Sequence, residues 1–139
     1  MPDPTPSNAA PRTVLIADDE PIIVRAMARL FADAGYEVHS VSSANAAKEI
    51  LDEVEPDAVF VDRNMPGNGV SVLEKLHGRP DGFAGLSVLM TGSLDDGELG
   101  ALQERVVRLQ KPFKFASIVP MVEAHFGEGG PGSNGSSPV

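Results

Sequence analysis

Short apolar runs alternate along this sequence with longer segments in which apolar residues recur at helical spacing. The short runs are typical of buried strands and are Thr13–Ala17, Tyr36–Val41, Ala58–Val61, Leu86–Met90 and Arg105–Leu109. The second run is more polar, which predicts a strand near an edge of the sheet. Strands that alternate with helices predict an α/β fold, in which a parallel sheet carries helices on both faces.

Proline, glycine and serine mark where the predicted helices begin and end. Pro21 suits the first turn of a helix that Gly35 closes, and Ser43 is expected to cap the second helix. A third helix is predicted over Val70–His77. The last helix contains a proline near its start, so we expect it to begin late, with Ser117 as its cap.

The two ends of the chain differ in composition from the segment between them. Residues 1–12 contain four prolines and no apolar core of a secretory signal, and residues 127–139 contain five glycines, three serines and two prolines. We therefore expect a folded domain over residues 13–126 between a flexible N-terminal tail and a flexible C-terminal tail or linker.

Charge and cysteine content exclude several classes of protein. Twenty acidic residues against eleven basic ones give a formal net charge of −9, which disfavours direct binding to nucleic acid or to an anionic membrane. The absence of cysteine excludes disulfides, zinc–thiolate sites and thiol nucleophiles. No apolar run is long enough to span a membrane, and the composition fits a cytoplasmic protein.

Polar side chains follow four of the predicted strands. Asp18 and Asp19 come after the first, Asp62 after the third, Thr91 after the fourth and Lys111 after the fifth. Each residue alone is also typical of a helix cap, a turn or a solvated surface. Together they should meet at one rim of the sheet, because the carboxyl ends of parallel strands share an edge. Crowded carboxylates without histidine or cysteine favour Mg²⁺ as the counter-ion.

The segments LIADDEP, VDRNMPGNG, MTG and QKPF, in this order and at strand ends, resemble the receiver domain of bacterial response regulators. The resemblance covers residues 13–126. It implies a doubly wound, flavodoxin-like sheet of five strands in the order 2-1-3-4-5. It also implies a phosphoacceptor module of a two-component phosphorelay, which is a signalling domain and not an enzyme acting on other substrates. Its partners would be a histidine kinase or phosphotransfer protein and a downstream protein target.

The resemblance also implies a metal and an acceptor. Asp62 would take a phosphoryl group from a histidine kinase. Asp18, Asp19 and Asp62, with the backbone carbonyl of Asn64, would hold Mg²⁺, which offsets the repulsion between an anionic carboxylate and an anionic phosphoryl group.

Further roles follow from the same resemblance. Lys111 would pair with a phosphoryl oxygen, and Thr91 would donate its hydroxyl to another oxygen after phosphorylation and move its loop. The Met65–Pro66 step would form a rigid corner, and the Lys111–Pro112 bond is expected to be cis. Glu20 has a weaker role, as a charge at the start of a helix.

Three features depart from the family pattern. Gly69 follows Asp62 one residue sooner than usual. The span from Thr91 to Lys111 is short and contains Gly97 and Gly100, so we expect a short or irregular fourth helix. Arg108 stands where the family carries an aromatic switch residue, and its charge would need a partner if it were buried. The phosphoacceptor is therefore better defined than the output mechanism.

Other functions on a similar fold fit less well. A phosphatase of the haloacid dehalogenase type requires a second aspartate two residues after the nucleophile, but Asn64 and Glu20 occupy the corresponding positions. A flavin-binding protein requires a phosphate loop rich in Ser, Thr and Gly, and the segment DDEP has the wrong charge. The remaining alternative is a pseudo-receiver, which would act as an interaction module without being phosphorylated.

Overall fold

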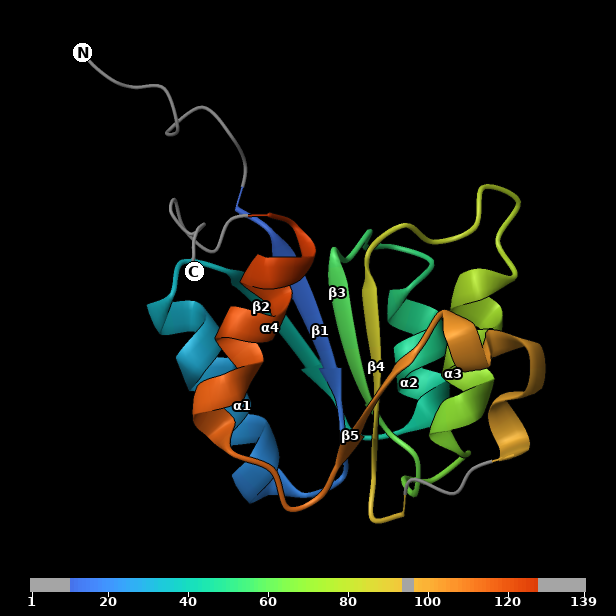
Figure 1. The fold of residues 1–139 in the computed structure, drawn as a ribbon, viewed down its shortest axis with the longest axis horizontal. Helices are drawn as coiled ribbons and strands as arrows, with labels where there is room; N and C mark the ends of the chain where they lie inside the picture. Colours follow the sequence, from blue (N-terminus) through green and yellow to red (C-terminus); the bar gives the residue numbers. More distant parts are fainter. Residues whose placement is uncertain (1–10, 94–96, 128–139) are drawn as a thin grey trace.

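The computed structural model describes residues 11–93 and 97–127. Its centre is one parallel sheet in the order β2-β1-β3-β4-β5 (Figure 1). The strands are β1 (Thr13–Ala17), β2 (Glu37–Val41), β3 (Ala58–Asp62), β4 (Leu86–Thr91) and β5 (Val107–Gln110). The predicted doubly wound fold is confirmed, and the polar second strand lies at an edge.

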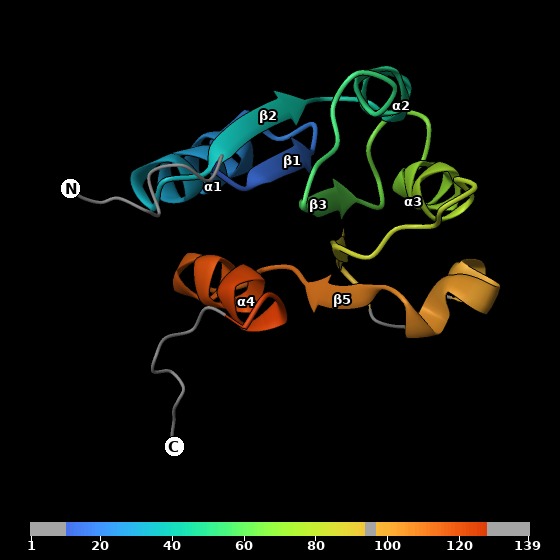
Figure 2. The same cartoon turned by 90° about the horizontal axis from the view of Figure 1, so that it is seen from above.

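Helices cover both faces of this sheet, as the view from above shows (Figure 2). One face carries α1 (Pro21–Asp33) and α4 (Ile118–His125). The short 3₁₀ turn η3 (Phe115–Ser117) directly precedes α4. The other face carries α2 (Ala44–Ile50), α3 (Gly69–His77) and the 3₁₀ segment η2 (Gly97–Glu104).

Each face has its own hydrophobic core, because successive side chains of a strand point to opposite sides. On the α1 and α4 face, buried strand residues such as Ile16 and Phe60 pack with Phe31 and Ile118. The core on the opposite face includes Leu15, Val59, Leu89, Leu73 and Leu76. Burying a side chain of this size stabilises the fold by about 1.5–3 kcal/mol. The three central strands are thereby fixed, and with them the positions of their carboxyl ends.

The helix boundaries agree in part with the predicted signals. Pro21 begins α1, and Gly35 follows its C-cap with φ +95°, a conformation that glycine adopts without strain. Ser43 caps α2, since its Oγ accepts a hydrogen bond from the Ala46 amide at 3.1 Å. The prediction for Ser117 is wrong in one respect. Helix α4 does begin late, at Ile118, but the Ser117 hydroxyl donates to the Lys114 carbonyl and closes the preceding turn.

The region of the fourth helix is irregular, as its glycines predicted. Segment η2 is a 3₁₀ helix interrupted at Gly100, which has φ 52° and ψ −122°. The predicted strand over 105–109 begins two residues later than expected, at Val107. The Arg105 amide donates to the Leu102 carbonyl, and the Arg105 carbonyl accepts from the Ser87 hydroxyl of β4, so Arg105 belongs to the preceding turn.

The two ends of the folded part lie together at the amino-terminal edge of the sheet. The Arg12 guanidinium stacks over the Phe126 ring, with 4.1 Å from its central carbon to the ring centre. The predicted tails, 1–12 and 127–139, lie outside the described residues apart from Pro11, Arg12 and Gly127. Across residues 11–93 and 97–127, no helix has both the length and the apolar character needed to cross a membrane.

Candidate functional site

The sheet brings most of the predicted site residues to one rim. Asp18 follows β1, Asp62 ends β3, Thr91 ends β4 and Lys111 follows β5. The strand register places these positions side by side, with Ala17 opposite Val61 and Asp62 opposite Met90. Asp18, Asp62 and Thr91 are between 1% and 4% exposed, so they are buried at the rim and do not lie on a solvated loop.

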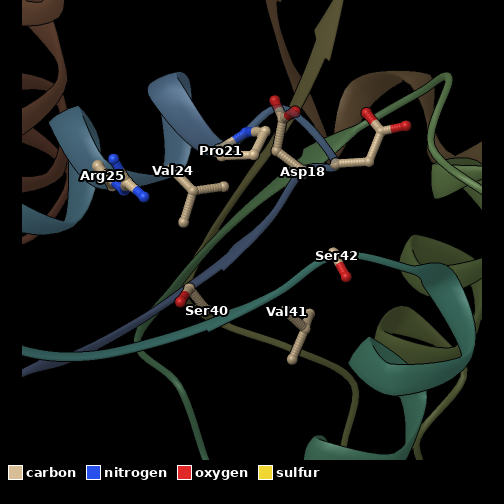
Figure 3. A pocket seen from close by; sticks show the side chains of 8 residues that line it. Asp18, Pro21, Val24, Arg25, Ser40, Val41 and Ser42 are labelled. Carbon is tan, nitrogen blue, oxygen red and sulfur yellow. The ribbon is translucent and has the colours of Figure 1, made fainter.

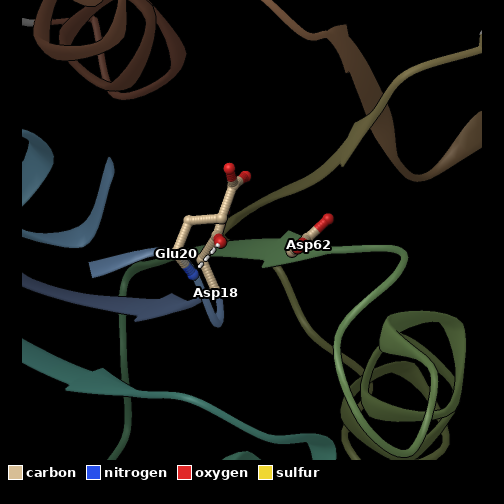
Figure 4. A group of neighbouring side chains, drawn as sticks. All are labelled: Asp18, Glu20 and Asp62. Carbon is tan, nitrogen blue, oxygen red and sulfur yellow. Dashed lines mark hydrogen bonds between the residues drawn. The ribbon is translucent and has the colours of Figure 1, made fainter. Parts of the chain in front are cut away.

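Three carboxylates cluster at this rim, from Asp18, Glu20 and Asp62 (Figure 4). One oxygen from each lies within 4.8 Å of the other two. The cluster is held by the backbone, because the Glu20 amide donates to Asp18 Oδ1 at 2.8 Å and the Asn64 amide donates to Asp62 Oδ1 at 3.2 Å. Like charges this close repel, so the arrangement attracts a cation.

Lys111 provides a cation within this cluster. Its Nζ lies 2.8 Å from Glu20 Oε1, 2.9 Å from Asp18 Oδ2 and 3.5 Å from Asp62 Oδ1. Burial disfavours the ammonium charge, but the Glu20 and Asp18 carboxylates more than offset this effect and raise the pKa of Lys111 above its ordinary value. Lys111 is therefore a permanent positive charge at the rim.

Asp62 is an unusual carboxylate. Burial, and then the neighbouring charge of Asp18, raise its pKa above the ordinary value, although the Asn64 amide and Lys111 oppose the shift. The free energy of a buried, crowded carboxylate falls when a metal ion or a covalent bond to an electrophile neutralises its charge. Asp62 thus has the chemical character of a nucleophile or a metal ligand.

The corner after β3 fixes where the Asp62 backbone lies. Gly69, the first residue of α3, packs so tightly on it that a Cβ at this position would meet the Asp62 carbonyl oxygen. Asn68, at φ 67°, caps α3 by accepting a hydrogen bond from the Val70 amide at 2.9 Å. The early position of Gly69 in the sequence therefore corresponds to a close contact behind the candidate nucleophile.

Asp19 does not belong to this carboxylate cluster. It is exposed and lines a hollow of about 300 Å³ beside α1 and β2, which Asp18, Arg25 and Ser40 also line (Figure 3). The structure groups Glu20, and not Asp19, with Asp18 and Asp62. Asp19 as a metal ligand remains a prediction.

Thr91 and Arg108 are the predicted switch residues. The Thr91 hydroxyl donates to the Ser93 carbonyl at 2.8 Å and accepts from the Ser93 amide at 3.1 Å, so it is bound to its own loop. The Thr91 carbonyl accepts from the Lys111 amide at 2.7 Å, and the Lys111–Pro112 bond is cis as predicted. Arg108 is exposed, consistent with the cost of burying its charge, and its part in the output remains a prediction.

Glu20 is the residue whose role the sequence understated. The signal lay in its position: it directly precedes Pro21, the first residue of α1, and therefore occupies the N-cap at the rim. Its side chain makes no cap hydrogen bond and reaches Lys111 instead. Beside it lies an apolar hollow of about 410 Å³ that includes Ile23, Lys111 and Phe113.

Comparison with known proteins gives consistent results. The family model described as Response regulator receiver domain matches residues 14–123. The chain is 31% identical over 117 residues to the transcriptional regulatory protein PrrA of Mycobacterium leprae, covering 84% of this chain and 50% of PrrA. It spans about half the length of the curated relatives it matches.

Two solved structures show the same fold. Chemotaxis response regulator CheY4 of Vibrio cholerae superposes with a TM-score of 0.71 at 20% identity, covering 83% of this chain and 98% of CheY4. The receiver domain of sensor histidine kinase PA1611 from Pseudomonas aeruginosa PAO1, solved with a magnesium ion coordinated in its active-site cleft, gives a TM-score of 0.69 at 24% identity. That match covers 85% of this chain and 99% of the other.

Proposed function

Since this chain belongs to the response regulator receiver domain family, a family of signalling modules, we propose that it is the phosphoacceptor of a two-component phosphorelay. Asp62 is the acceptor. The observation that carries the proposal is the placement of a buried carboxylate with a raised pKa beside a second buried carboxylate and a lysine.

The reaction is a transfer between two nucleophiles. An Asp62 carboxylate oxygen attacks the phosphorus of a phosphohistidine, the phosphorus–nitrogen bond breaks, and the bonding electron pair leaves with the imidazole. Lys111 lies within reach of the oxygens that gain charge, and its raised pKa keeps it protonated at neutral pH. The domain thus promotes its own phosphorylation and dephosphorylation and has no other substrate.

Mg²⁺ is the proposed cofactor. Asp18, Asp19, Asp62 and the backbone carbonyl of Asn64 would hold it, and it would neutralise charge between the carboxylate and the incoming phosphoryl group. The carboxylate cluster at the rim supports the Asp18 and Asp62 part of this assignment, because their hard oxygen donors lie close together and repel one another. The magnesium ion in the PA1611 receiver is consistent with it.

The proposed phosphodonor is a histidine kinase or a phosphotransfer protein of the cytoplasm. Ile22, on the first turn of α1, is 80% exposed and borders the apolar hollow beside Lys111. An apolar surface next to the acceptor suits a protein that must hold its histidine near Asp62 during transfer. A downstream protein target would recognise the phosphorylated form.

Intact-protein mass spectrometry after incubation with acetyl phosphate and Mg²⁺ tests the proposal. The wild type should gain the mass of one phosphoryl group. The gain should be absent without Mg²⁺ and absent in Asp62→Asn. The change to Asn keeps the shape of the side chain, so a folded variant that fails to label locates the acceptor.

Beryllofluoride distinguishes a labile phosphate from a pseudo-receiver. A wild type that shows no mass gain at short times but binds beryllofluoride would be phosphorylated and hydrolysed quickly. A protein that gives neither response would be a pseudo-receiver, and the proposed function would then be wrong.

A further inference from the structure

The contacts of Lys111 are unequal in a way that the transfer reaction does not explain. Its Nζ lies closest to Glu20 and Asp18, at 2.8 Å and 2.9 Å, and 3.5 Å from Asp62. A receiver lysine that serves the phosphoryl group must act at Asp62. In this structure the ammonium group contacts all three carboxylates of the rim, and it lies closer to Glu20 and Asp18 than to Asp62.

The two close partners also differ in how firmly they are held. Asp18 is 1% exposed, and its other oxygen accepts a hydrogen bond from the Glu20 amide. The Glu20 side chain is 58% exposed and extends from the end of a helix. An ion pair with an exposed carboxylate is weak and exchanges readily with solvent, whereas a buried one is not replaced by water.

Glu20 therefore has the properties of a releasable partner. Its contact with Lys111 holds one of the three ammonium N–H groups on the α1 side of the site. When a phosphoryl group arrives on Asp62, its oxygens compete with Glu20 for the same ammonium, and the exposed carboxylate can rotate into water at little cost.

We propose that Glu20 is a positioning residue that holds the Lys111 ammonium closer to itself and to Asp18 than to Asp62 before phosphorylation, and that it releases the ammonium as the phosphoryl group is transferred. This inference rests on the proposed function of Asp62. It assigns Glu20 to the lysine and not to the metal, although its carboxylate belongs to the rim cluster. Glu20 accordingly sets the rate of phosphorylation without contacting the reacting atoms.

Two substitutions of Glu20 separate the effect of its side-chain length from the effect of its charge. Glu20→Asp keeps the negative charge but is one methylene shorter and cannot hold Lys111 at 2.8 Å. Glu20→Gln keeps the length and removes the charge. Both should raise the rate constant for labelling by acetyl phosphate about two- to fivefold, the range expected when an exposed ion pair no longer competes. Glu53→Gln is the matched control and should not change the rate. Glu53 is an exposed acid in the turn before the amino-terminal end of β3.

A double-mutant cycle shows whether the effect passes through Lys111. In a Lys111→Met background, which labels more slowly, Glu20→Asp and Glu20→Gln should no longer raise the rate. An equal increase in both backgrounds would mean that Glu20 acts only by repelling the anionic donor, and the proposal would be overturned.

Magnesium affinity gives a readout that does not depend on labelling. Titration calorimetry with MgCl₂ should give dissociation constants within about twofold for wild type and Glu20→Asp, whereas loss of a group that supports a metal typically weakens binding about 10- to 100-fold. A loss in the latter range would make Glu20 a metal-site residue and contradict the proposal. If wild type labels and both Glu20 variants label at its rate, this inference alone fails; if wild type neither labels nor binds beryllofluoride, the proposed function fails and this inference with it.

Discussion

Gly69 lies directly against Asp62: a Cβ built on Gly69 would overlap the Asp62 carbonyl oxygen and come within 2.6 Å of Val61 Cγ1. Both of those groups belong to β3, at the centre of the sheet, where neither can move aside. The start of α3 and the backbone of the candidate acceptor are therefore in a contact that only glycine permits.

Gly69→Ala should accordingly destabilise the domain by about 2–3 kcal/mol, the usual cost of forcing an extra group into a packed site. Urea unfolding followed by circular dichroism measures this difference. Gly92→Ala is the control, because within residues 11–93 and 97–127 a Cβ at Gly92 would meet no heavy atom within 4 Å, and its effect should stay within about 0.5 kcal/mol. Equal effects at the two positions would show that the contact behind Asp62 is not restrictive.

The charge of Asp62 should lower the stability of the metal-free protein. Burial and Asp18 raise its pKa, so the folded state disfavours the ionised form. The unfolding free energy therefore falls as pH rises from 3.8, the ordinary pKa of an aspartate, through the raised pKa of Asp62. It stays lowered at higher pH. At pH 7.5 with a chelator, Asp62→Asn should therefore be more stable than wild type by about 1 kcal/mol, or a few degrees in Tm.

Magnesium should reverse that order, since binding stabilises the folded wild type by mass action and the variant lacks one proposed ligand. Thermal unfolding with and without MgCl₂ measures both effects. Asp57→Asn is the matched control. Asp57 lies at the amino-terminal end of β3, and its carboxylate accepts a hydrogen bond from the Thr13 amide at 2.8 Å. A similar gain from Asp57→Asn would attribute the result to overall net charge and not to crowding at the rim.

Thr91 should exchange partners when Asp62 is phosphorylated. Its hydroxyl is now bound to the Ser93 backbone, and it must leave the Ser93 carbonyl to donate to a phosphoryl oxygen. Backbone amide NMR should show a large change at Ser93 on addition of beryllofluoride to wild type and Thr91→Ser. Thr91→Ala should bind beryllofluoride with a much smaller change at Ser93. An undiminished response in Thr91→Ala would remove Thr91 from the switch.

A buried chain of hydrogen bonds links α3 to the turn that precedes β5. Ser87 Oγ donates to the Arg105 carbonyl at 3.0 Å, which uses its single hydrogen, so His77 Nε2 must donate to Ser87 Oγ across 2.9 Å. Ser87→Ala would leave a buried donor and a carbonyl without this partner and should cost about 1–3 kcal/mol in urea unfolding. Ser71→Ala, at a half-buried position of α3, should cost less, because the Ser71 hydroxyl has a single hydrogen that faces the Gly67 and Asn68 carbonyls at a solvent-exposed site.

His77 should also make stability depend on pH. Burial, and then the charge of Arg105, lower its pKa below 6.5, so the folded state resists protonation. The stability contributed by neutral His77 is complete above pH 6.5 and is lost as pH falls toward the lowered pKa. Between pH 7.5 and 5.5 the wild type should lose more unfolding free energy than His77→Gln. His125→Gln, at an exposed position, should lose as much unfolding free energy as wild type. If His77→Gln also lost as much as wild type, His77 would not be the source of the pH dependence.

Sequence patterns predicted the sheet because its central strands are continuous apolar runs and its helices begin at recognisable caps. The same patterns placed Asp18, Asp62, Thr91 and Lys111 at one rim, since topology alone brings strand ends together. They missed the pairing of Glu20 with Lys111, which joins residues 91 positions apart through the rotamers of two long side chains. They also misplaced the start of β5, because the Arg105 carbonyl is bound by Ser87, a residue from another strand.

The contact between Arg12 and Phe126 bears on how such a domain can be built into larger proteins. The chain enters and leaves the fold at nearly one point, on the edge opposite Asp62. A domain with adjoining ends can be inserted into a single surface loop of a host, or have its ends joined and reopened elsewhere, with little change to its interior. In this fold such rearrangements leave the rim that carries Asp18 and Asp62 unchanged, so the arrangement of this rim does not depend on where along the sequence the chain begins.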